Sequence, residues 1–344
     1  SFLIVRVVYK KEVHPMKEYL SIFIDEEYPT FIDKYLNTKT LNRIKYRTQF
    51  CGCDYTNLYS PRFLYTRFDH SLVVAHMTWH FTHKKQETIA ALLHDIGTPC
   101  FAHCVDYVLG DYMNQESSEK NIVDVIKEDN ELLSYLKEDG IKLTDLEKLS
   151  NYPILENKSP RLCTDRLDGV LHTCYIWLHT HTLNEIKEVF DDIIVLKNED
   201  GIPEIGFKNI QTSEKFVKMV FNYAKELQEN TDKYVMKYIS EIIKLSIHSK
   251  FLYLEDFYTM KEEEICRVIK NHFSSWSIFE KAKDLISTEE LPNDNFYVSL
   301  ETKKRNTIPL VKTEHGTFRI NEVSRYADTF YQELLLFKPK KYVY

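Results

Sequence analysis

Histidine is the most unevenly distributed residue type in this chain, and it is also well suited to metal chemistry. Six of the thirteen histidines fall between residues 70 and 103, where uniform placement would give about one. They are His70, His76, His80, His83, His94 and His103. Neutral imidazole nitrogens are good ligands for transition metals, and carboxylates balance the charge of a divalent ion. The cluster therefore predicts a metal site that also uses aspartate.

The adjacent pair His94-Asp95 is the most specific part of this pattern. Consecutive residues on a helix point about 100° apart, so the pair can offer two ligands to one ion at the edge of a helical face. An unpaired aspartate at the end of the apolar segment 91–97 would be costly to bury. His70 upstream and Asp165 downstream each lie at a predicted helix edge. We expect these four residues to share one ion.

The elements that position these residues are predicted to be mostly helices, because long stretches have apolar residues at 3.6-residue spacing and few helix breakers. One helix is expected from residue 87 to about 97, others over 216–227 and 234–243, and another opened by a capping box of Thr259 and Glu262. A hairpin is predicted for 193–196 and 202–207, and a second β patch for 296–300 and 308–320.

Composition excludes several classes of function. The 344 residues are 43% hydrophobic and 28% charged, which is ordinary for a folded globular chain. The eight glycines never form G-x-G or a P-loop, so dinucleotide and Walker-type sites are absent from the sequence. A net charge of −7 argues against nucleic acid as a general partner. The seven cysteines form no paired C-x-x-C motifs, so we expect reduced thiols and a cytoplasmic protein. No apolar stretch is long enough for a membrane span, so we expect no membrane partner.

Four segments resemble, in order, the H…HD…D signature of the HD-domain metal-dependent phosphohydrolases. They are TRFDHSL (66–72), ALLHDIG (91–97), FAH (101–103) and TDRLD (164–168). The nearest branch is the deoxynucleoside triphosphate triphosphohydrolases, which include SAM-and-HD-domain enzymes, and segments 41–45 and 254–258 extend the resemblance to residues 28–272. It implies a mainly α fold with an N-terminal extension (1–27), an HD-domain helical core with the metal site (28–190) and a C-terminal helical region with small β elements packed on the core (191–344).

The resemblance also implies roles for individual residues. His70, His94, Asp95 and Asp165 would hold one divalent ion per chain, and the donor types do not choose among Mn, Fe, Zn, Ni and Mg. Arg67 would reach phosphate oxygens, and His103 would relay protons beside the scissile phosphate. Gln49 and Arg166 would contact the substrate, Gln49 near the sugar, and Glu119 would keep part of the acid–base role.

The sequence departs from that branch at three positions. Thr98 and Ser118 stand where the branch carries histidines, and Gly169 replaces a tyrosine of the nucleotide pocket. Glu119 and His172 are candidates to replace the missing acid–base groups. The departures leave metal-assisted hydrolysis intact but weaken the expectation of triphosphate release.

The predicted function is a metal-dependent phosphohydrolase acting on nucleotides, with hydrolysis of a dNTP to deoxynucleoside and triphosphate as the leading reaction. The alternatives are a phosphomonoesterase or phosphodiesterase on the same site, and a non-catalytic nucleotide-binding HD protein. Relatives assemble as dimers or larger, so a homo-oligomer is expected.

Other polar residues allow two interpretations. His76 with His80, His179 with His181, and Cys51 with Cys53 could bind metal, but each lacks further ligands and is more typical of a polar face or a turn. Asp168 is either a supporting partner of the site or a surface charge. The basic residues 303–305 and 338–341 could touch nucleotide phosphates across a subunit boundary, although solvated charge is the more usual role.

Overall fold

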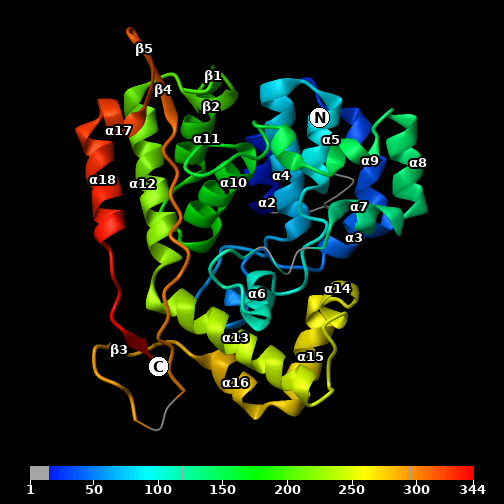
Figure 1. Ribbon diagram of the computed structural model, residues 1–344, viewed down its shortest axis with the longest axis vertical. Coiled ribbons are helices and arrows are strands. Elements are labelled where there is room, and N and C mark those ends of the chain that lie inside the picture. Colours follow the sequence, from blue (N-terminus) through cyan, green and yellow to red (C-terminus); the bar gives the residue numbers. More distant parts are fainter. Residues whose placement is uncertain (1–14, 116, 118–119, 294–295) are drawn as a thin grey trace.

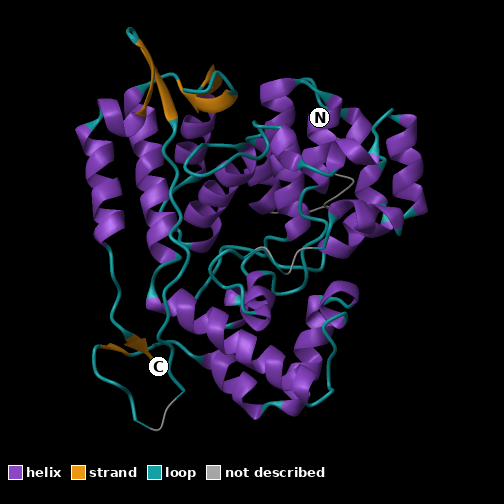
Figure 2. Ribbon diagram, viewed as in Figure 1, coloured by secondary structure: helices purple, strands orange, loops and turns teal. Residues whose placement is uncertain are grey.

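The computed structural model describes residues 15–115, 117, 120–293 and 296–344, and Figure 1 labels its elements. The earlier helices are α2 (Pro15–Ser21), α3 (Lys39–Ile44), α4 (Arg67–Thr82), α5 (Lys85–Leu93), α6 (His103–Leu109), α7 (Ile122–Lys127), α8 (Asn130–Glu138), α9 (Leu143–Leu146) and α10 (Thr164–His172). The later helices are α11 (Leu183–Asp191), α12 (Ile210–Glu226), α13 (Asn230–His248), α14 (Asp256–Thr259), α15 (Glu262–His272), α16 (Ser274–Lys281), α17 (Ile320–Val323) and α18 (Arg325–Leu336). The strands are β1 (Ile193–Lys197), β2 (Pro203–Phe207), β3 (Ser287–Thr288), β4 (Leu310–Thr313), β5 (Gly316–Arg319) and β6 (Tyr342–Val343). Figure 2 shows that helices dominate, which confirms the predicted mainly α class with small β elements in the C-terminal half.

Helix α4 lies at the centre of the functional region. It begins at a capping box, in which the Thr66 hydroxyl accepts the Asp69 N–H and the Asp69 carboxylate accepts the Thr66 N–H. Every side chain from Arg67 to Thr78 is buried, because α5 and α10 pack directly on this helix. The packing brings the first turn of α4, the end of α5 and the first turn of α10 together.

The β elements form two small sheets away from α4. Strands β1 and β2 pair antiparallel across the predicted turn, β2 pairs parallel with β4, and β4 and β5 form a second hairpin. A Cβ at Gly206 would lie 2.6 Å from the Leu310 carbonyl oxygen, so glycine is required for β2 to approach β4 this closely. The predicted strand over 296–300 is largely wrong, because only Val298 makes a bridge there, to Val343 beside β3.

One hydrophobic cluster joins the two ends of the described chain. It extends from Met16 in α2 to Tyr331 in α18. Helix α2 inserts Tyr19 into this core, and Phe23 follows directly after the helix. Residues early in the chain are therefore packed around the same core as α4.

The predicted capping box of Thr259 and Glu262 is wrong. Thr259 ends the short helix α14, and its hydroxyl donates to the Glu255 carbonyl. Helix α15 begins after Lys261, and Glu262 in its first turn is almost fully buried. Its carboxylate is used for tertiary contacts and does not cap the helix.

The sequence predicts neither a membrane-spanning segment nor a disulfide framework. None of the described helices has the length and apolar character needed to cross a bilayer. All seven cysteines are described, and none forms a disulfide.

Candidate metal centre

Three helix ends bring the four predicted ligands together. His70 lies in the first turn of α4, and Asp165 lies in the first turn of α10. His94 and Asp95 follow α5 directly. The prediction that this pair lies on a helical face is wrong, because α5 ends at Leu93 and the pair occupies the following turn. The turn still directs both side chains toward α4.

The donor atoms have the spacing expected for ligands of one ion. His70 Nε2 lies 3.1 Å from Asp165 Oδ1 and 3.2 Å from His94 Nε2, and His94 Nε2 lies 3.6 Å from Asp165 Oδ1. Asp95 is slightly farther, with an oxygen 3.9 Å from His70 Nε2. Ligands about 2.1 Å from a shared ion lie roughly 3.0–3.5 Å apart. The two imidazoles lie close to this spacing from Asp165, and with Asp95 they form a group that could hold an ion. Two nitrogen and two oxygen donors suit a divalent transition metal.

Both histidines are oriented by hydrogen bonds at Nδ1. His94 Nδ1 lies 2.7 Å from the Ala91 carbonyl oxygen, which can only accept a proton. His70 Nδ1 lies 2.6 Å from Asp168 Oδ2. Each bond places the ring proton on Nδ1, so the Nε2 lone pairs face the donor set.

The charges in this cluster stabilise one another. Burial would lower the pKa of His70, but hydrogen bonds with Asp165 and Asp168 raise it to about 10. Without an ion His70 Nε2 therefore carries a proton, which a bound metal would replace. Burial alone would raise the pKa of Asp165, because it disfavours the charged carboxylate. Hydrogen bonds with His70 and His94, and their charges, instead hold that pKa well below its usual range. The side chain of Asp165 is 40% exposed, whereas that of His70 is 3% exposed. Solvent therefore reaches the cluster from the Asp165 side.

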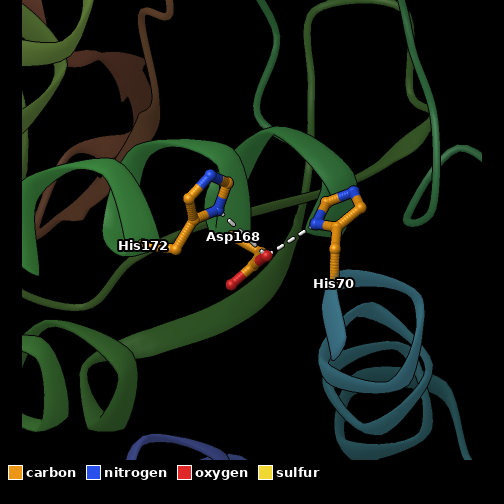
Figure 3. A group of neighbouring side chains, drawn as sticks. All are labelled: His70, Asp168 and His172. Atoms are coloured by element: carbon orange, nitrogen blue, oxygen red, sulfur yellow. Dashed lines mark hydrogen bonds and ion pairs between the residues drawn. The ribbon is translucent and has the colours of Figure 1, made fainter. Parts of the chain in front are cut away.

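Asp168 supports His70 from behind the donor set. Figure 3 shows the carboxylate between His70 and His172, which lies 3.2 Å away on the same helix. Tyr19 and Tyr65 donate their hydroxyl protons to it at 2.7 and 2.8 Å. Four donors thus surround a carboxylate with no exposed surface. His70, Asp168 and His172 also have the spacing of a metal group, but these hydrogen bonds make Asp168 a positioning residue for His70.

Tyr19 and Tyr65 were missed by sequence reasoning. Tyr19 lies in α2, 149 residues before its partner Asp168. No spacing rule connects such positions, and a tyrosine in an apolar helix is typical of an ordinary core residue.

Arg67 contacts a predicted metal ligand directly. Its Nη1 donates to Asp95 Oδ2 at 2.8 Å, and its Nη2 lies 3.9 Å from the Cys51 sulfur. Burial would raise the pKa of Asp95, but the Arg67 charge, followed by those of His94 and His70, lowers it. Thr98 donates its hydroxyl proton to the other Asp95 oxygen at 3.3 Å. Asp95 is therefore fixed in its anionic form.

His103 begins α6 and is paired with an acid that the sequence did not single out. Its Nδ1 lies 3.0 Å from Asp106 Oδ2, and Asp106 is fully buried while His103 is 27% exposed. Burial lowers the pKa of His103, and the positive charges of Arg305 and Arg67 lower it further. The hydrogen bond with Asp106 opposes this shift but does not cancel it. The ring is therefore neutral near pH 7, with its Nε2 lone pair available as a proton acceptor. The sequence could have indicated this pair, because side chains three residues apart on a helix lie next to each other.

The loop from His94 to His103 is anchored from elsewhere in the chain. Arg43 and Arg47 donate to the carbonyl oxygens of Ile96 and Thr98. The buried Glu262 carboxylate accepts the Phe101 N–H at 2.9 Å. Phe101 and Ala102 have φ values of 58° and 35°, which are unfavourable for residues other than glycine. These contacts hold the loop in that conformation.

Other predicted site residues are placed as follows. The Gln49 Oε1 atom is buried, and no hydrogen-bond partner lies near it within the described ranges. The structure does not bring Arg166 to the donor set: its guanidinium donates to Asn157 and to the Arg161 carbonyl. His172 lies behind Asp168. Glu119 and Ser118 lie outside the described residues.

The remaining histidine and cysteine pairs have ordinary partners. His80 pairs with Asp25 at 2.5 Å, and His76 lies against the Tyr28 ring. Cys53 faces Asp232. Within the part of the chain that the structure describes, the groups spaced to hold a metal include none of these pairs.

Comparison with known proteins identifies the fold. No family model matches the chain. The uncharacterised protein YdhJ of Bacillus subtilis is 28% identical over 211 residues, which are 60% of this chain and 62% of YdhJ. The match therefore spans less than two thirds of that relative.

Solved structures match over more of the chain. A hypothetical protein from Aquifex aeolicus has a TM-score of 0.60 at 21% identity, and the match covers 90% of each chain. A phosphohydrolase from Bacteroides thetaiotaomicron has a TM-score of 0.61 at 16% identity, covering 93% of this chain and 96% of that one. The chain thus shares its fold with these two proteins over nearly its whole length.

Proposed function

We propose that this chain is a metal-dependent phosphohydrolase that acts on nucleotides. The observation that carries the proposal is the donor set of His70, His94, Asp95 and Asp165, which three helix ends bring to the spacing of ligands around one ion. A divalent ion held there would polarise a phosphate group and lower the pKa of a bound water. The phosphohydrolase with the same fold supports this assignment.

The chain's own residues supply the other functions of such a site. Asp168 keeps the His70 lone pair directed at the donor set. Arg67 is held beside the donor set by its ion pair with Asp95, where the guanidinium can also donate to a phosphate oxygen. His103, oriented by Asp106, accepts or returns a proton at Nε2. Solvent-exposed Asp165 marks the side from which substrate enters.

We propose a nucleotide substrate, with triphosphate release from a dNTP as the leading reaction. Gly169 lies one helical turn after Asp165, and a Cβ there would meet no atom within 4 Å, so space is open beside the donor set. The unpartnered Gln49 Oε1 is suited to accept a hydrogen bond from a polar ligand such as a sugar hydroxyl. Thr98 donates its hydroxyl proton to Asp95 and does not titrate near neutral pH as a histidine would. The dNTP reaction is therefore expected to be slow.

The test is incubation with each NTP and dNTP, a cyclic nucleotide and a simple phosphomonoester, with Mn, Fe, Zn, Ni or Mg, followed by separation of the phosphate products. Triphosphate from a dNTP supports the leading reaction, while orthophosphate or an opened cyclic ester supports the alternatives. Absence of metal-dependent turnover, combined with nucleotide binding, would instead support a non-catalytic sensor. Asp165→Asn is the control that must abolish any turnover by this site.

A further inference from the structure

Two carboxyl groups meet at one hydroxyl next to the loop of residues 94–103. Asp54 belongs to a short 3-10 helix, and Glu262 is the first residue of α15. Thr48 Oγ1 lies 2.9 Å from Glu262 Oε1 and 3.2 Å from Asp54 Oδ1. A hydroxyl has one proton, so it can donate to one of the two acids and can only accept from the other. An ionised carboxylate has no proton to donate, so both contacts are hydrogen bonds only when one acid is protonated.

The surroundings of this pair supply too little positive charge for both acids to ionise. Glu262 is 1% exposed, and Asp54 is half-buried. Among the described residues, no lysine, arginine or histidine nitrogen lies within 4.0 Å of either carboxyl group. The buried Arg47 guanidinium interacts with Glu262 from farther away, and it donates to the carbonyl oxygens of Thr98 and Tyr258. One cation at that distance does not balance two carboxylates in a buried position.

The other titratable groups that face the pair are neutral near pH 7. Tyr55 donates its hydroxyl proton to Glu262 Oε1 at 3.2 Å. Burial raises the pKa of Cys100 to about 12, and it also raises the pKa values of Cys266 and Tyr55. Burial, followed by the charge of Glu262, raises the pKa of Asp54 to about 7. Titration near neutral pH in this cluster therefore belongs to the two acids.

The pair connects two segments that position the donor set. The second oxygen of Glu262, Oε2, accepts the Phe101 N–H at 2.9 Å, within the loop 94–103. Phe101 has a φ of 58°, so this hydrogen bond holds the backbone in an unfavourable conformation. Thr48 forms an antiparallel bridge with Thr66, the N-cap of α4. A change at the pair therefore acts on the loop and on the start of α4.

We propose that Asp54 and Glu262 hold one proton between them through Thr48, and that this proton fixes the loop 94–103 to α15. Loss of the proton leaves two negative charges on either side of one hydroxyl, where they repel each other and attract water. The Phe101 N–H then loses its acceptor, and the loop can leave its unfavourable conformation. The loop is thus fixed at low pH and released as pH rises. This device goes beyond the proposed function, because it does not depend on the substrate.

Amide hydrogen exchange of the full chain tests this device, because exchange reports local opening of the loop. The readout is the protection factor of the Phe101 amide, corrected for the intrinsic exchange rate, at about pH 5.5 and about pH 8.5. Asp54→Asn keeps a donor for Thr48 but removes one acid. Glu262→Gln keeps an acceptor for Phe101 but removes the other acid. Between the two pH values, wild-type protection should fall at least about tenfold more than that of either variant, since one pKa unit of linkage is a factor of ten.

The requirement for both acids distinguishes a shared proton from the titration of either group alone. The proposal is overturned if the full wild-type pH dependence persists in Asp54→Asn or in Glu262→Gln, or if wild-type protection is the same at both pH values. Glu263→Gln, an exposed change on α15, is the matched control and should follow the wild type. If one variant does not fold in a thermal unfolding control, the other variant and the wild-type profile decide. No step of this test uses a substrate, so its failure and a failure of the proposed function are distinguishable.

Discussion

At the scale of single residues, Asp168 determines which nitrogen of His70 faces the donor set. The carboxylate accepts from His70, His172, Tyr19 and Tyr65 and has no exposed surface. Removing its charge leaves the His70 tautomer undetermined and two tyrosine hydroxyls poorly satisfied. We therefore expect Asp168→Asn to lower metal affinity about 10- to 100-fold, measured by competition with a chelator.

Tyr65→Phe serves as the matched variant for that prediction. It removes one hydrogen bond to Asp168 and should cost about 1 kcal/mol of unfolding free energy, with a smaller effect on metal affinity. An Asp168→Asn chain with wild-type metal affinity would show that the network serves only packing.

Asp165 offers the cleanest test of the donor set, because it is partly exposed and Arg67 pairs with Asp95 instead. Asp165→Asn keeps the side-chain shape but removes the anionic oxygen. The wild-type chain should contain close to one transition metal per chain by elemental analysis, and Asp165→Asn should lose most of it. Asp124→Asn, an exposed change on α7, is the control and should retain the metal. Full retention in Asp165→Asn would reject this residue as a ligand.

His103 and Asp106 are predicted to act together in proton transfer. His103→Ala should keep the metal and lose at least about tenfold in kcat, the lower range for general acid–base catalysis. Asp106→Asn should give a smaller loss, because the imidazole remains but its Nδ1 proton is no longer held by a carboxylate. Thr98→His should preserve or raise dNTP hydrolysis. A fast dNTP reaction that is indifferent to His103→Ala would contradict the assignment.

At the scale of elements, the loop carrying His94 and His103 depends on helix α15. Glu262 in that helix accepts the Phe101 N–H and the Thr48 hydroxyl proton. Burial raises the pKa of Glu262 above its ordinary 4.5, although hydrogen bonds from Phe101 and Thr48 oppose the shift. The folded chain therefore keeps this proton to higher pH than the unfolded chain does.

The sign of the resulting pH dependence follows from that shift. Stability from the protonated Glu262 is present below pH 4.5 and is lost as pH rises through the folded pKa. Relative to Glu262→Gln, the wild-type unfolding free energy should fall as pH rises above 4.5, by up to about 1.4 kcal/mol per pH unit. Denaturant unfolding in the presence of a chelator measures this difference. The exposed Glu263→Gln on the same helix should show no such trend.

The sequence predicted those elements whose residues are determined by local rules. The helix periods, the β1–β2 turn and the order of the ligand segments are local patterns, so the fold class and the convergence of His70, His94 and Asp165 could be predicted. The role of Glu262 could not, because an acid three residues after Thr259 has the same local pattern whether it caps a helix or makes a buried contact. The role of Tyr19 depends on a contact with Asp168, 149 residues away, which no spacing rule describes.

At the scale of the whole molecule, bound metal should stabilise the fold. A ligand that binds only the folded chain raises the unfolding free energy by about 2.7 kcal/mol at a hundredfold excess over its Kd. Chelation of the purified chain should therefore lower Tm, and re-addition of the ion should restore it. Asp165→Asn should show a chelator-independent Tm. A wild-type Tm that does not respond to chelation would mean that the donor set holds no ion in solution.

The hydrogen bond between Tyr19 and Asp168 also determines how the molecule can be divided. All four donor residues lie between positions 70 and 165, so a fragment covering 28–190 would contain every ligand. That fragment would lack the tyrosine hydroxyl of α2 and the Glu262 carboxylate that supports the His103 loop. The candidate site is therefore not modular: an excised core or a split protein would contain all four predicted ligands without the groups that position them.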